Sequence, residues 1–441
     1  MLEAGSSLHD QDTVRIPAGL VQRSLASAPR SFSIYDRHGV ERLLLGSGQP
    51  HAGAGATALY YEDPSSGERR EYTLEDIGTS TRVVDALGSI DFMTTPGVVK
   101  PSDDLRIELM NQREFLQMVT NTTKPLMVII ADGPSLEDIF EMAAVVAGGR
   151  QELLARPFVF PYLNTVSPLL LNPETCDKLL IAADWGMPVV CQPAPQLGAT
   201  SPVPVAGTVV VSAAESLAAL VLSQLCRPGT PFISGVLPYV MDMRTANVWI
   251  GGPETNAIQA AFADLCRYWG LPIMGAGGTD AKTIDGQFGV ENAYYTTSVF
   301  LSGVDLTFDT GCLECGLGWS PVAAVVGDEV VRMVRSYVSG IRIDDETLSV
   351  EAIREVGPAE NFLAHPQTLA TFRDMWRPSI LDTEIRSRWE ALGSPSLADR
   401  ARAKALEIIA EHTVEALDPH MLAGMEDVID RRARALPPEE D

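Results

Sequence analysis

A unit made of a short apolar run, a turn and a helical stretch repeats eight times between Thr57 and Thr310. The apolar runs, each rich in residues that favour strands, are Thr57–Tyr61, Ile90–Thr94, Pro125–Ala131, Pro157–Leu163, Pro188–Gln192, Pro231–Leu237, Pro272–Gly277 and Asp305–Thr310. Their starts lie 33, 35, 32, 31, 43, 41 and 33 residues apart, a spacing typical of strand–helix units. Eight such units predict an α/β fold, the closed (β/α)8 barrel, whose active sites lie on the loops after the carboxyl ends of the strands.

The repeats divide the chain into three parts. We expect an N-terminal extension over residues 1–54, the barrel over residues 55–340 and a mainly helical C-terminal extension over residues 341–441. In the last part, Leu397–Leu417 shows helical apolar spacing with mixed charge. Helices outside the barrel favour a surface for homo-oligomer formation rather than a site of chemistry.

The composition limits the kinds of partner. Lys and Arg total 33 against 58 Asp and Glu, which gives a net charge of −25 and argues against nucleic acid or an anionic membrane as the main partner. The acidic balance suits a cationic ligand or a basic protein, although solubility alone also explains it. Met1–Asp10 lacks the apolar stretch of a signal peptide, and no run reaches the roughly 18 apolar residues of a membrane span. With six cysteines, several in apolar patterns, we expect a reduced, cytoplasmic protein.

The densest group of polar residues follows the seventh apolar run, over Gly275–Gln287. The first three glycines, Gly275, Gly277 and Gly278, allow a tight turn or a close approach of the backbone to a ligand. Asp280, Lys282 and Gln287 follow them, at the end of the barrel where this fold keeps its sites. The alternative is a helix cap, in which Asp280 and Asp285 accept hydrogen bonds from backbone amides.

A second group lies at the end of the eighth run. Asp309 ends an otherwise apolar strand, where a carboxylate is costly to bury unless it is paired with a cation or hydrogen-bonded to loop amides. Glu314 follows in the next loop. Cys312 and Cys315 have the spacing of a metal-binding pair, but no second pair exists and no histidine ends a predicted strand, so we expect no metal.

Other predicted strand ends bring aromatic and amide side chains to the same mouth. These side chains are Tyr162, Asn164, Gln192, Tyr239 and Phe308. An aromatic-lined mouth with a few carboxylates suits a quaternary or tertiary ammonium group, because each ring face attracts a cation by roughly 0.5–2 kcal/mol. Packing of the aromatic rings into the core is the alternative. Two long loops, Pro193–Val211 and Pro238–Gly252, would frame this mouth.

Several short segments spread along the chain resemble the trimethylamine methyltransferase family. They are Arg15-Ile16-Pro17 with Ala28-Pro29-Arg30, Asn121-Thr-Thr-Lys124-Pro125, Gly277-Gly278-Thr279-Asp280-Ala281-Lys282-x-x-Asp285-x-Gln287, Asp309-x-Gly311-x-Leu313-x-x-Gly316-Leu317, and Glu355-Val-Gly357-Pro358 with Asn361-Phe362-Leu363. The resemblance covers nearly the whole chain. It implies a (β/α)8 barrel that moves a methyl group from a methylated amine to the cobalt of a separate corrinoid protein.

On this resemblance the chain itself binds no cofactor, and the corrinoid (cobalamin) comes with the partner protein. The sequence contains only the common amino acids, so it is similar to the branch without pyrrolysine, which includes glycine betaine:corrinoid methyltransferases. We expect Asp280, Asp309 and Gln287 to be the catalytic residues. The substrate-binding residues would be Tyr162, Asn164, Gln192, Tyr239, Lys282, Phe308 and Glu314.

Two other functions fit the same residues. One is a barrel that binds a methylated amine or another small cation without transferring a methyl group. The other is a zinc-dependent thiol methyltransferase, which would need bound zinc. Every site prediction requires the loops that carry Asp280 and Asp309 to meet over one shared cavity at the barrel mouth.

Overall fold

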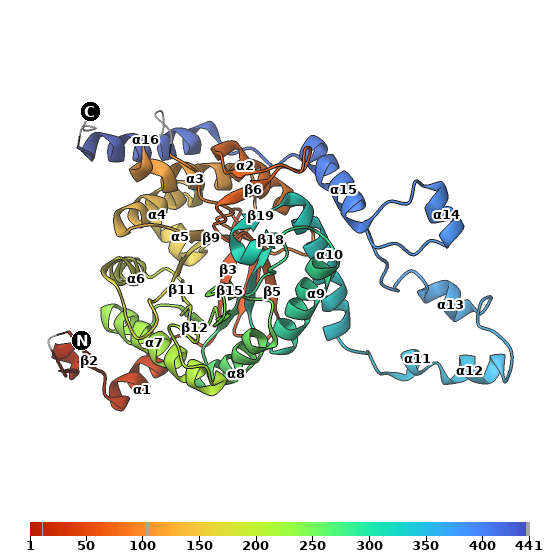
Figure 1. Ribbon diagram of the computed structural model, residues 1–441, viewed down its shortest axis with the longest axis horizontal. Helices are drawn as coiled ribbons and strands as arrows, with labels where there is room; N and C mark the ends of the chain where they lie inside the picture. Colours follow the sequence, from red (N-terminus) through yellow and green to blue (C-terminus); the bar gives the residue numbers. More distant parts are fainter. Residues whose placement is uncertain (11, 102–105, 438–441) are drawn as a thin grey trace.

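The structure, a computed structural model, describes residues 1–10, 12–101 and 106–437; the end of the predicted C-terminal extension, residues 438–441, lies outside them. Eight parallel strands close into a barrel, which confirms the predicted (β/α)8 fold (Figure 1). In chain order they are β5 (His51–Ala54), β8 (Phe92–Thr94), β9 (Leu126–Ile129), β10 (Val159–Leu163), β11 (Val189–Cys191), β13 (Phe232–Gly235), β16 (Ile273–Gly275) and β17 (Leu306–Thr310). The last strand closes the ring by pairing with the first, Leu306 opposite His51 and Thr307 opposite Ala52.

Eight helices follow the strands and surround the barrel. They are α2 (Leu74–Ala86), α3 (Met110–Thr120), α4 (Gly133–Ala147), α6 (Pro173–Trp185), α7 (Val205–Cys226), α8 (Pro253–Trp269), α9 (Gly286–Leu301) and α10 (Pro321–Val338), with the short α5 (Arg150–Ala155) after α4. Five of these helices are capped by side chains that accept bonds from first-turn amides: Thr73, Asp132, Asn172, Asp285 and Ser320. Helix α7 begins at Val205, so the predicted Pro193–Val211 loop is shorter than expected.

The predicted first strand, Thr57–Tyr61, is wrong. The first barrel strand is β5 at His51–Ala54, and Tyr60–Glu62 instead forms β6 of a separate sheet at the rim. The sequence of β5 is short and built of small residues, so it carries a weak strand signal. Small residues are needed there: a Cβ added at Gly53 would lie 2.3 Å from the ring of Phe92.

Two small sheets surround the carboxyl ends of the barrel strands. One contains β12 (Gln196–Leu197), β14 (Tyr239–Met241) and β15 (Val248–Trp249). The other contains β6 (Tyr60–Glu62), β7 (Arg69–Glu71), β18 (Cys312–Leu313) and β19 (Gly318–Trp319), with the 3-10 turn η3 (Glu314–Gly316) between β18 and β19. The loops of the mouth are thus held by backbone hydrogen bonds, which position the side chains they carry.

The N-terminal residues close the opposite end of the barrel. After η1 (Leu2–Ala4), β1 (Ser7–Leu8), β2 (Val14–Arg15) and α1 (Ala18–Ser27), the chain forms a hairpin of β3 (Phe32–Tyr35) and β4 (Glu41–Leu45). Ile34, Leu43 and Leu45 of the hairpin are fully buried in the same cluster as Met127 and Phe160, which point into the barrel. The barrel interior is therefore a packed core, which the hairpin closes at this end.

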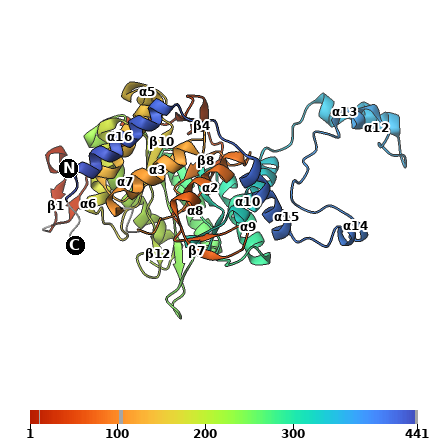
Figure 2. The same cartoon turned by 90° about the horizontal axis from the view of Figure 1, so that it is seen from above.

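The C-terminal part divides into packed helices and a projecting arm. Helix α15 (Leu397–Glu411) packs on α10 and α2, and α16 (Pro419–Ala435) packs on α4, α3 and the turn η2 (Ile107–Leu109). Between α10 and α15, the chain leaves the barrel as an arm with the short helices α11 (Asp345–Leu348), α12 (Val350–Val356), α13 (Pro366–Thr371) and α14 (Arg386–Ala391). Figures 1 and 2 show this arm extending away from the body in both views.

One helix, α7, is long and apolar enough to cross a membrane by length and composition. In the structure it packs against α1, α6, α8 and strand β13. Helices of a barrel that face both the sheet and their neighbours need apolar residues on several sides. The position of α7 in the ring accounts for its composition.

Lys124, from the motif before the third strand, holds the base of the barrel together. Its Nζ donates to the carbonyl oxygens of Val84 (2.6 Å), Leu87 (2.7 Å) and Ile90 (2.6 Å), which connect α2 to β8. We expect Lys124→Met to lower the free energy of unfolding by roughly 2–4 kcal/mol, because three carbonyls lose their donor. Chemical denaturation measures this. Lys404→Met, at an exposed ion pair, is the control and should change stability by less than about 0.5 kcal/mol; equal effects would contradict this role of Lys124.

Candidate functional site

The loops after β16 and β17, which carry Asp280 and Asp309, lie side by side at the barrel mouth. Two backbone hydrogen bonds join them: Cys315 N–H donates to Thr279 O (2.8 Å), and Glu314 N–H donates to Ala281 O (2.9 Å). Burial is the main cause that raises the pKa of the Cys315 thiol to about 12, and the nearby carboxylates of Asp280 and Asp309 add to the shift. The two stretches are therefore in direct contact, and a shared cavity between Asp280 and Asp309 stays a prediction.

Asp280 holds the neighbouring loop. Its carboxylate accepts hydrogen bonds from Ile250 N–H (3.1 Å to each oxygen) and from Gly251 N–H (2.8 Å). Glycine is required at 251, because an added Cβ would lie 2.8 Å from Glu291 and 3.0 Å from Asp280. Asp280 thus fixes the end of the long Pro238–Gly252 loop. This role resembles the alternative predicted from the sequence, in which the Asp280 carboxylate accepts hydrogen bonds from backbone amides.

Gln287 and Glu291 support the same loop from α9. Glu291 accepts bonds from the Asp280 backbone N–H (2.8 Å) and from the Thr279 hydroxyl (2.5 Å). The exposed Gln287 side chain donates from Nε2 to the other Glu291 oxygen (2.9 Å). Gln287 therefore contacts the loop through Glu291, and its catalytic role stays a prediction.

Lys282 and Glu314 lie on the outer side of the mouth. The Lys282 ammonium is exposed and donates to Asp280 O (2.6 Å), while Glu314 accepts two bonds from Arg69 (2.7 and 2.9 Å). Both residues line a surface cavity of about 320 Å³, together with Tyr60 and Trp319. Their side chains are engaged away from the barrel axis, and their predicted contact with substrate stays untested.

Asp309 is the buried carboxyl of the mouth. It adopts a left-handed backbone conformation (φ 77°), and its side chain accepts one bond from Gly277 N–H (3.0 Å) and contacts the Cys312 thiol (3.8 Å). Among the described residues, no Lys or Arg pairs with this carboxyl, and desolvation raises its pKa well above the ordinary value. A buried acid in a cleft region with a strongly raised pKa is a candidate functional residue.

The tyrosines Tyr162, Tyr239 and Tyr295 lie within electrostatic range of this carboxyl. The rings of Tyr162 and Phe308 lie 5.4 Å apart in a tilted arrangement. Burial, and then the charge of Asp309 and the neighbouring Tyr162, raises the pKa of Tyr239 well above its usual range. Three predicted binding residues, Tyr162, Tyr239 and Phe308, are therefore grouped with Asp309.

Asn164 and Gln192 fix the orientation of this cluster. Asn164 Nδ2 donates to the Tyr162 hydroxyl (2.9 Å) and to the backbone oxygen of Gln192 (2.7 Å). The fully buried Gln192 side chain donates from Nε2 to Met274 O (3.1 Å) across the barrel. Its Oε1 is buried and has no hydrogen-bond partner among the described residues, so it is available to a donor on a ligand.

Tyr295, on α9, was not expected from the sequence. Its ring packs on Gly277, where an added Cβ would lie 2.1 Å from the ring, and its hydroxyl contacts the Thr307 hydroxyl and Phe308 O. Burial, and then the charge of Asp309, raises the pKa of Tyr295. The signal in the sequence was the glycine itself, because a glycine at a strand end indicates a close neighbour.

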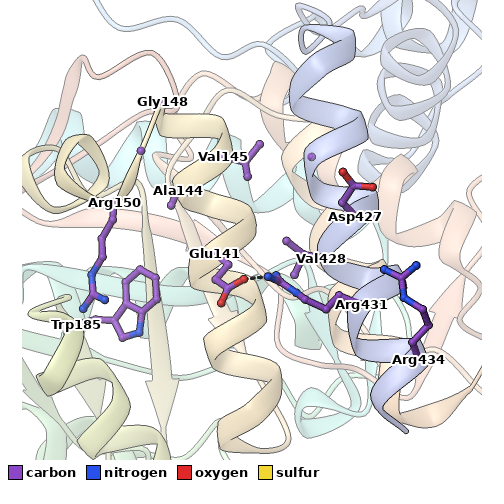
Figure 3. A pocket seen from close by; sticks show the side chains of 12 residues that line it. Glu141, Ala144, Val145, Gly148, Arg150, Trp185, Asp427, Val428, Arg431 and Arg434 are labelled. Carbon is purple, nitrogen blue, oxygen red and sulfur yellow. Dashed lines mark hydrogen bonds and ion pairs between the residues drawn. The ribbon is translucent and has the colours of Figure 1, made fainter.

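A cavity of about 960 Å³ lies elsewhere, between α4 and α16 on the outer surface (Figure 3). Figure 3 shows Arg431 directed at Glu141, with which it forms an ion pair, and Arg150 lies 4.0 Å over the Trp185 ring. These charged groups already have partners within the chain. The site of chemistry is therefore better placed at the barrel mouth, which is where this fold keeps its active sites.

Comparison with known proteins identifies the family of the chain. The family model described as "Trimethylamine methyltransferase (MTTB)" matches residues 1–437. The chain belongs to the trimethylamine methyltransferase family. This membership agrees with the resemblance of the motifs around Lys124, Asp280 and Asp309.

Relatives of this methyltransferase include proteins named for two substrates. Trimethylamine methyltransferase MttB of Desulfitobacterium hafniense (strain DSM 10664 / DCB-2) is 31% identical over 422 residues, covering 95% of this chain and 84% of the relative. Trimethylamine methyltransferase MttB1 of Methanosarcina acetivorans is 30% identical over 433 residues, covering 96% and 86%. Glycine betaine methyltransferase of Desulfitobacterium hafniense (strain Y51) is 28% identical over 419 residues, covering 94% and 86%.

A solved methyltransferase shares the barrel. The hydroxylamine complex of MtmB has a TM-score of 0.54 with 11% identity, covering 90% of this chain and 81% of that one. A structure of the Methanosarcina barkeri monomethylamine methyltransferase (MtmB) has a TM-score of 0.51 with 11% identity over the same shares. At this identity the likeness concerns the fold alone.

The position of Asp280 in this methyltransferase predicts how its loss acts. Asp280→Ala should free the Ile250 and Gly251 amides, because hydrogen bonds to a charged acceptor contribute about 1.5–3 kcal/mol. Hydrogen exchange at these two amides measures the effect and should speed up at least tenfold, with a smaller change for Asp280→Asn, which keeps one acceptor oxygen. Unchanged exchange in Asp280→Ala would show that the loop is held by other contacts.

Proposed function

We propose that this protein moves a methyl group from a quaternary or tertiary methylated amine, betaine-like in character, to the cobalt of a separate corrinoid protein. Family membership supports methyl transfer, and the names of the relatives, trimethylamine methyltransferase and glycine betaine methyltransferase, support a methylated amine as the donor. The partner would be a corrinoid protein, and the reaction would take place in the cytoplasm. The chain itself would supply the site for the amine.

The observation that carries this proposal is the Asp309 carboxyl, which is buried, has no cation beside it in the described part of the chain, and lies within electrostatic range of Tyr162 and Tyr239. A methylated ammonium would bring the missing positive charge and would favour the ionised form of the carboxyl. The faces of Tyr162, Phe308 and Tyr239 would contact its methyl groups through cation–π attraction. The rings also keep water away from the cation, which strengthens both interactions.

The chemistry needs little from the protein beyond position. The C–N bond of the donor breaks, its electron pair stays on nitrogen, and the methyl carbon forms a bond with the electron pair of cobalt(I) in the acceptor. The leaving group from a quaternary ammonium is a neutral amine, so no proton donor is required. Positive charge on nitrogen fades as the reaction proceeds, so the attraction to Asp309 would contribute mainly to substrate binding. The ring faces attract the cation more weakly than a close carboxylate and would restrain the ground state less.

The mouth also has to admit the cobalt centre of the acceptor. The sheets β12–β14–β15 and β6–β7–β18–β19 follow the carboxyl ends of the barrel strands and would form the rim that the acceptor meets. Asp280 fixes the Pro238–Gly252 loop at this rim through Ile250 and Gly251. We propose that this loop frames the approach of the acceptor protein.

The zinc-dependent alternative would need convergent metal ligands at the mouth. In the described part of the chain, no three His, Cys, Asp or Glu side chains lie in an arrangement that could hold a metal ion. Cys312 contacts the Asp309 carboxyl, and burial raises its pKa well above the usual range, so it favours the protonated thiol.

Asp309→Asn tests the proposal, because asparagine tolerates the left-handed backbone that alanine resists. The purified chain, a reduced corrinoid and a panel of methylated amines are mixed, and the cobalt spectrum reports methyl transfer. We expect transfer with at least one methylated amine, and a loss of about 100-fold or more in kcat/KM for the variant. Wild-type binding without any spectral change would favour the non-catalytic cation-binding barrel.

The matched control is Asp305→Asn, at the other end of the same strand. Asp305 is also buried, but its carboxylate is bonded by Gly46 N–H (2.6 Å) and Ile273 N–H (2.9 Å), far from the mouth. Methyl transfer by the folded Asp305 variant should stay within about twofold of the wild type, since its stability but not its site is changed. Equal losses in both variants would assign the effect of Asp309 to folding.

Binding of a quaternary amine should depend on pH through Asp309. Its pKa in the free protein is raised by burial, so below that pKa the carboxyl is protonated and the cation must displace a proton. Affinity should therefore rise with pH until the carboxyl is ionised in the free protein, and then level off. Titration calorimetry in buffers of different ionisation enthalpy measures the proton released, and Asp309→Asn should remove the dependence.

The raised pKa of Asp309 makes the stability of the fold depend on pH in the opposite direction to the binding of the amine. Burial raises the pKa of the Asp309 carboxyl in the folded state. Such a group stabilises the fold fully at pH values below its pKa in the unfolded chain, and this stabilisation is lost as the pH rises through its pKa in the folded protein. Asp309→Asn should therefore lose activity while becoming as stable as the wild type, or more stable, at neutral pH. A variant that is both inactive and strongly destabilised would contradict this account of Asp309.

A further inference from the structure

The closing strand β17 contains a bulge between Thr307 and Thr310. Two of its residues, Phe308 and Asp309, lie opposite the single residue Gly53 of β5. An extra residue of this kind bends a strand locally and redirects a side chain, and bulges are common next to active sites. The bulge is therefore the local structure that carries the acid of the candidate site.

The bulge brings two consecutive side chains to the mouth. In a regular strand successive side chains point to opposite faces, so Asp309 would lie on the other side of the sheet from Phe308. The Phe308 ring lies 5.4 Å from the ring of Tyr162. Burial raises the pKa of Tyr162 and of Tyr239, and the nearby Asp309 carboxylate raises both further. Asp309 thus reaches the same group of side chains as Phe308, and its left-handed backbone (φ 77°) is part of the bend that allows this.

Tyr295 of α9 holds the strand just before the bulge. Its hydroxyl forms a hydrogen bond with the Thr307 hydroxyl and lies 3.5 Å from Phe308 O. Thr307 is the last residue of β17 that pairs in register with β5 before the shift. The side chains of Tyr295 and Thr307 are both buried, so this hydrogen bond is shielded from water, which strengthens it.

The same tyrosine packs on the amide that binds the carboxylate. An added Cβ at Gly277 would lie 2.1 Å from the Tyr295 ring, so the ring is in direct contact with this residue. Gly277 N–H donates to the Asp309 carboxylate (3.0 Å). Tyr295 therefore contacts both the strand that carries Asp309 and the residue that donates to its carboxylate.

Trp319 holds the strand after the bulge. Its fully buried indole donates from Nε1 to Thr310 O (2.9 Å) and packs on Gly311, where an added Cβ would lie 2.5 Å from Nε1. Thr310 is the residue at which the pairing with β5 resumes. The bulge is thus held on both sides, by Tyr295 from a helix and by Trp319 from the rim sheet.

We propose that Tyr295 is a positioning residue, which keeps the bulge of β17 in the shape that directs the Asp309 carboxylate at the methylated ammonium. This inference rests on the proposed function, because it takes Asp309 as the group that binds the cation. Tyr295 acts through the strand and does not need to touch the amine. Its effect matters because a displacement of about 1 Å at such a group can cost up to about 100-fold in rate.

Two variants break the same hydrogen bond from its two ends. Tyr295→Phe removes the hydroxyl and keeps the ring on Gly277, and Thr307→Val removes the partner hydroxyl with a side chain of similar shape. The matched control is Tyr72→Phe. The ring of Tyr72 packs on Gly97 in the same way (2.3 Å), but Tyr72 lies in the segment between β7 and α2. The control thus removes a buried tyrosine hydroxyl from another part of the chain.

Calorimetry with tetramethylammonium measures the affinity of the site for a methylated cation. Tyr295→Phe and Thr307→Val should each bind this probe about three- to tenfold more weakly than the wild type, as expected for the loss of one buried hydrogen bond. Tyr72→Phe should stay within about twofold of the wild type. Circular dichroism and thermal melting confirm that each variant is folded.

A double-mutant cycle with Asp309→Asn separates positioning from a general effect on the structure. If Tyr295 acts through the Asp309 carboxylate, Tyr295→Phe should change the affinity by less than about twofold once that carboxylate is removed. An equal loss with and without the carboxylate, or no loss in Tyr295→Phe alone, would overturn the proposal.

Hydrogen exchange at the Gly277 amide tests the same role without any ligand. This amide should exchange at least threefold faster in Tyr295→Phe than in the wild type or in Tyr72→Phe, because its bond to Asp309 is held less firmly. Unchanged exchange would contradict the positioning role even if the amine binds. A wild type that binds no tetramethylammonium would instead contradict the proposed function, and faster exchange in Tyr295→Phe would still support the hold of Tyr295 on Asp309.

Discussion

Strand β17 is the element on which the rest of this barrel depends, because it pairs with β16 on one side and with β5 on the other. Without it the sheet would stay open and its edges would lack partners. The strand also carries a buried carboxyl at each end, Asp305 toward the closed end and Asp309 at the mouth. The closing strand thus links the integrity of the ring to the position of the candidate site.

The two carboxyls differ in how their charge is accommodated. Asp305 accepts bonds from the backbone amides of Gly46 and Ile273, and so ties the N-terminal segment and a neighbouring strand to the ring. Asp309 has one amide and one thiol, and no cation among the described residues. The first arrangement serves stability, and the second leaves an interaction to be completed by a ligand.

The architecture was predictable because strand spacing reports it directly, and seven of the eight predicted runs contain or overlap barrel strands. The first barrel strand, His51–Ala54, was missed because it needs small residues where it packs against Phe92. Packing of this kind leaves no periodic pattern of apolar residues in the sequence. Tyr162, Tyr239 and Phe308 were predicted as a group because they follow strand ends. Tyr295 could not be found in this way, since it reaches the cluster from a helix.

The loop residues show a second limit of sequence reasoning. Asp280 and Lys282 stand two positions apart, yet their side chains have different roles. The Asp280 carboxylate fixes a neighbouring loop, whereas the Lys282 side chain is exposed. Position in a loop indicates which end of the barrel a residue occupies, but not the direction of its side chain. Glu314 likewise pairs with Arg69, a residue far away in the chain whose place could be known only from the fold.

The left-handed backbone at Asp309 restricts how this site can change during evolution. Only glycine, asparagine and aspartate adopt that conformation readily, so few single substitutions at position 309 are conformationally neutral. Diversification toward new amines would have to occur at surrounding positions such as 162, 239 and 308, whose backbones impose no such limit. Natural variants and selection libraries should therefore differ in the rings around a nearly invariant acid.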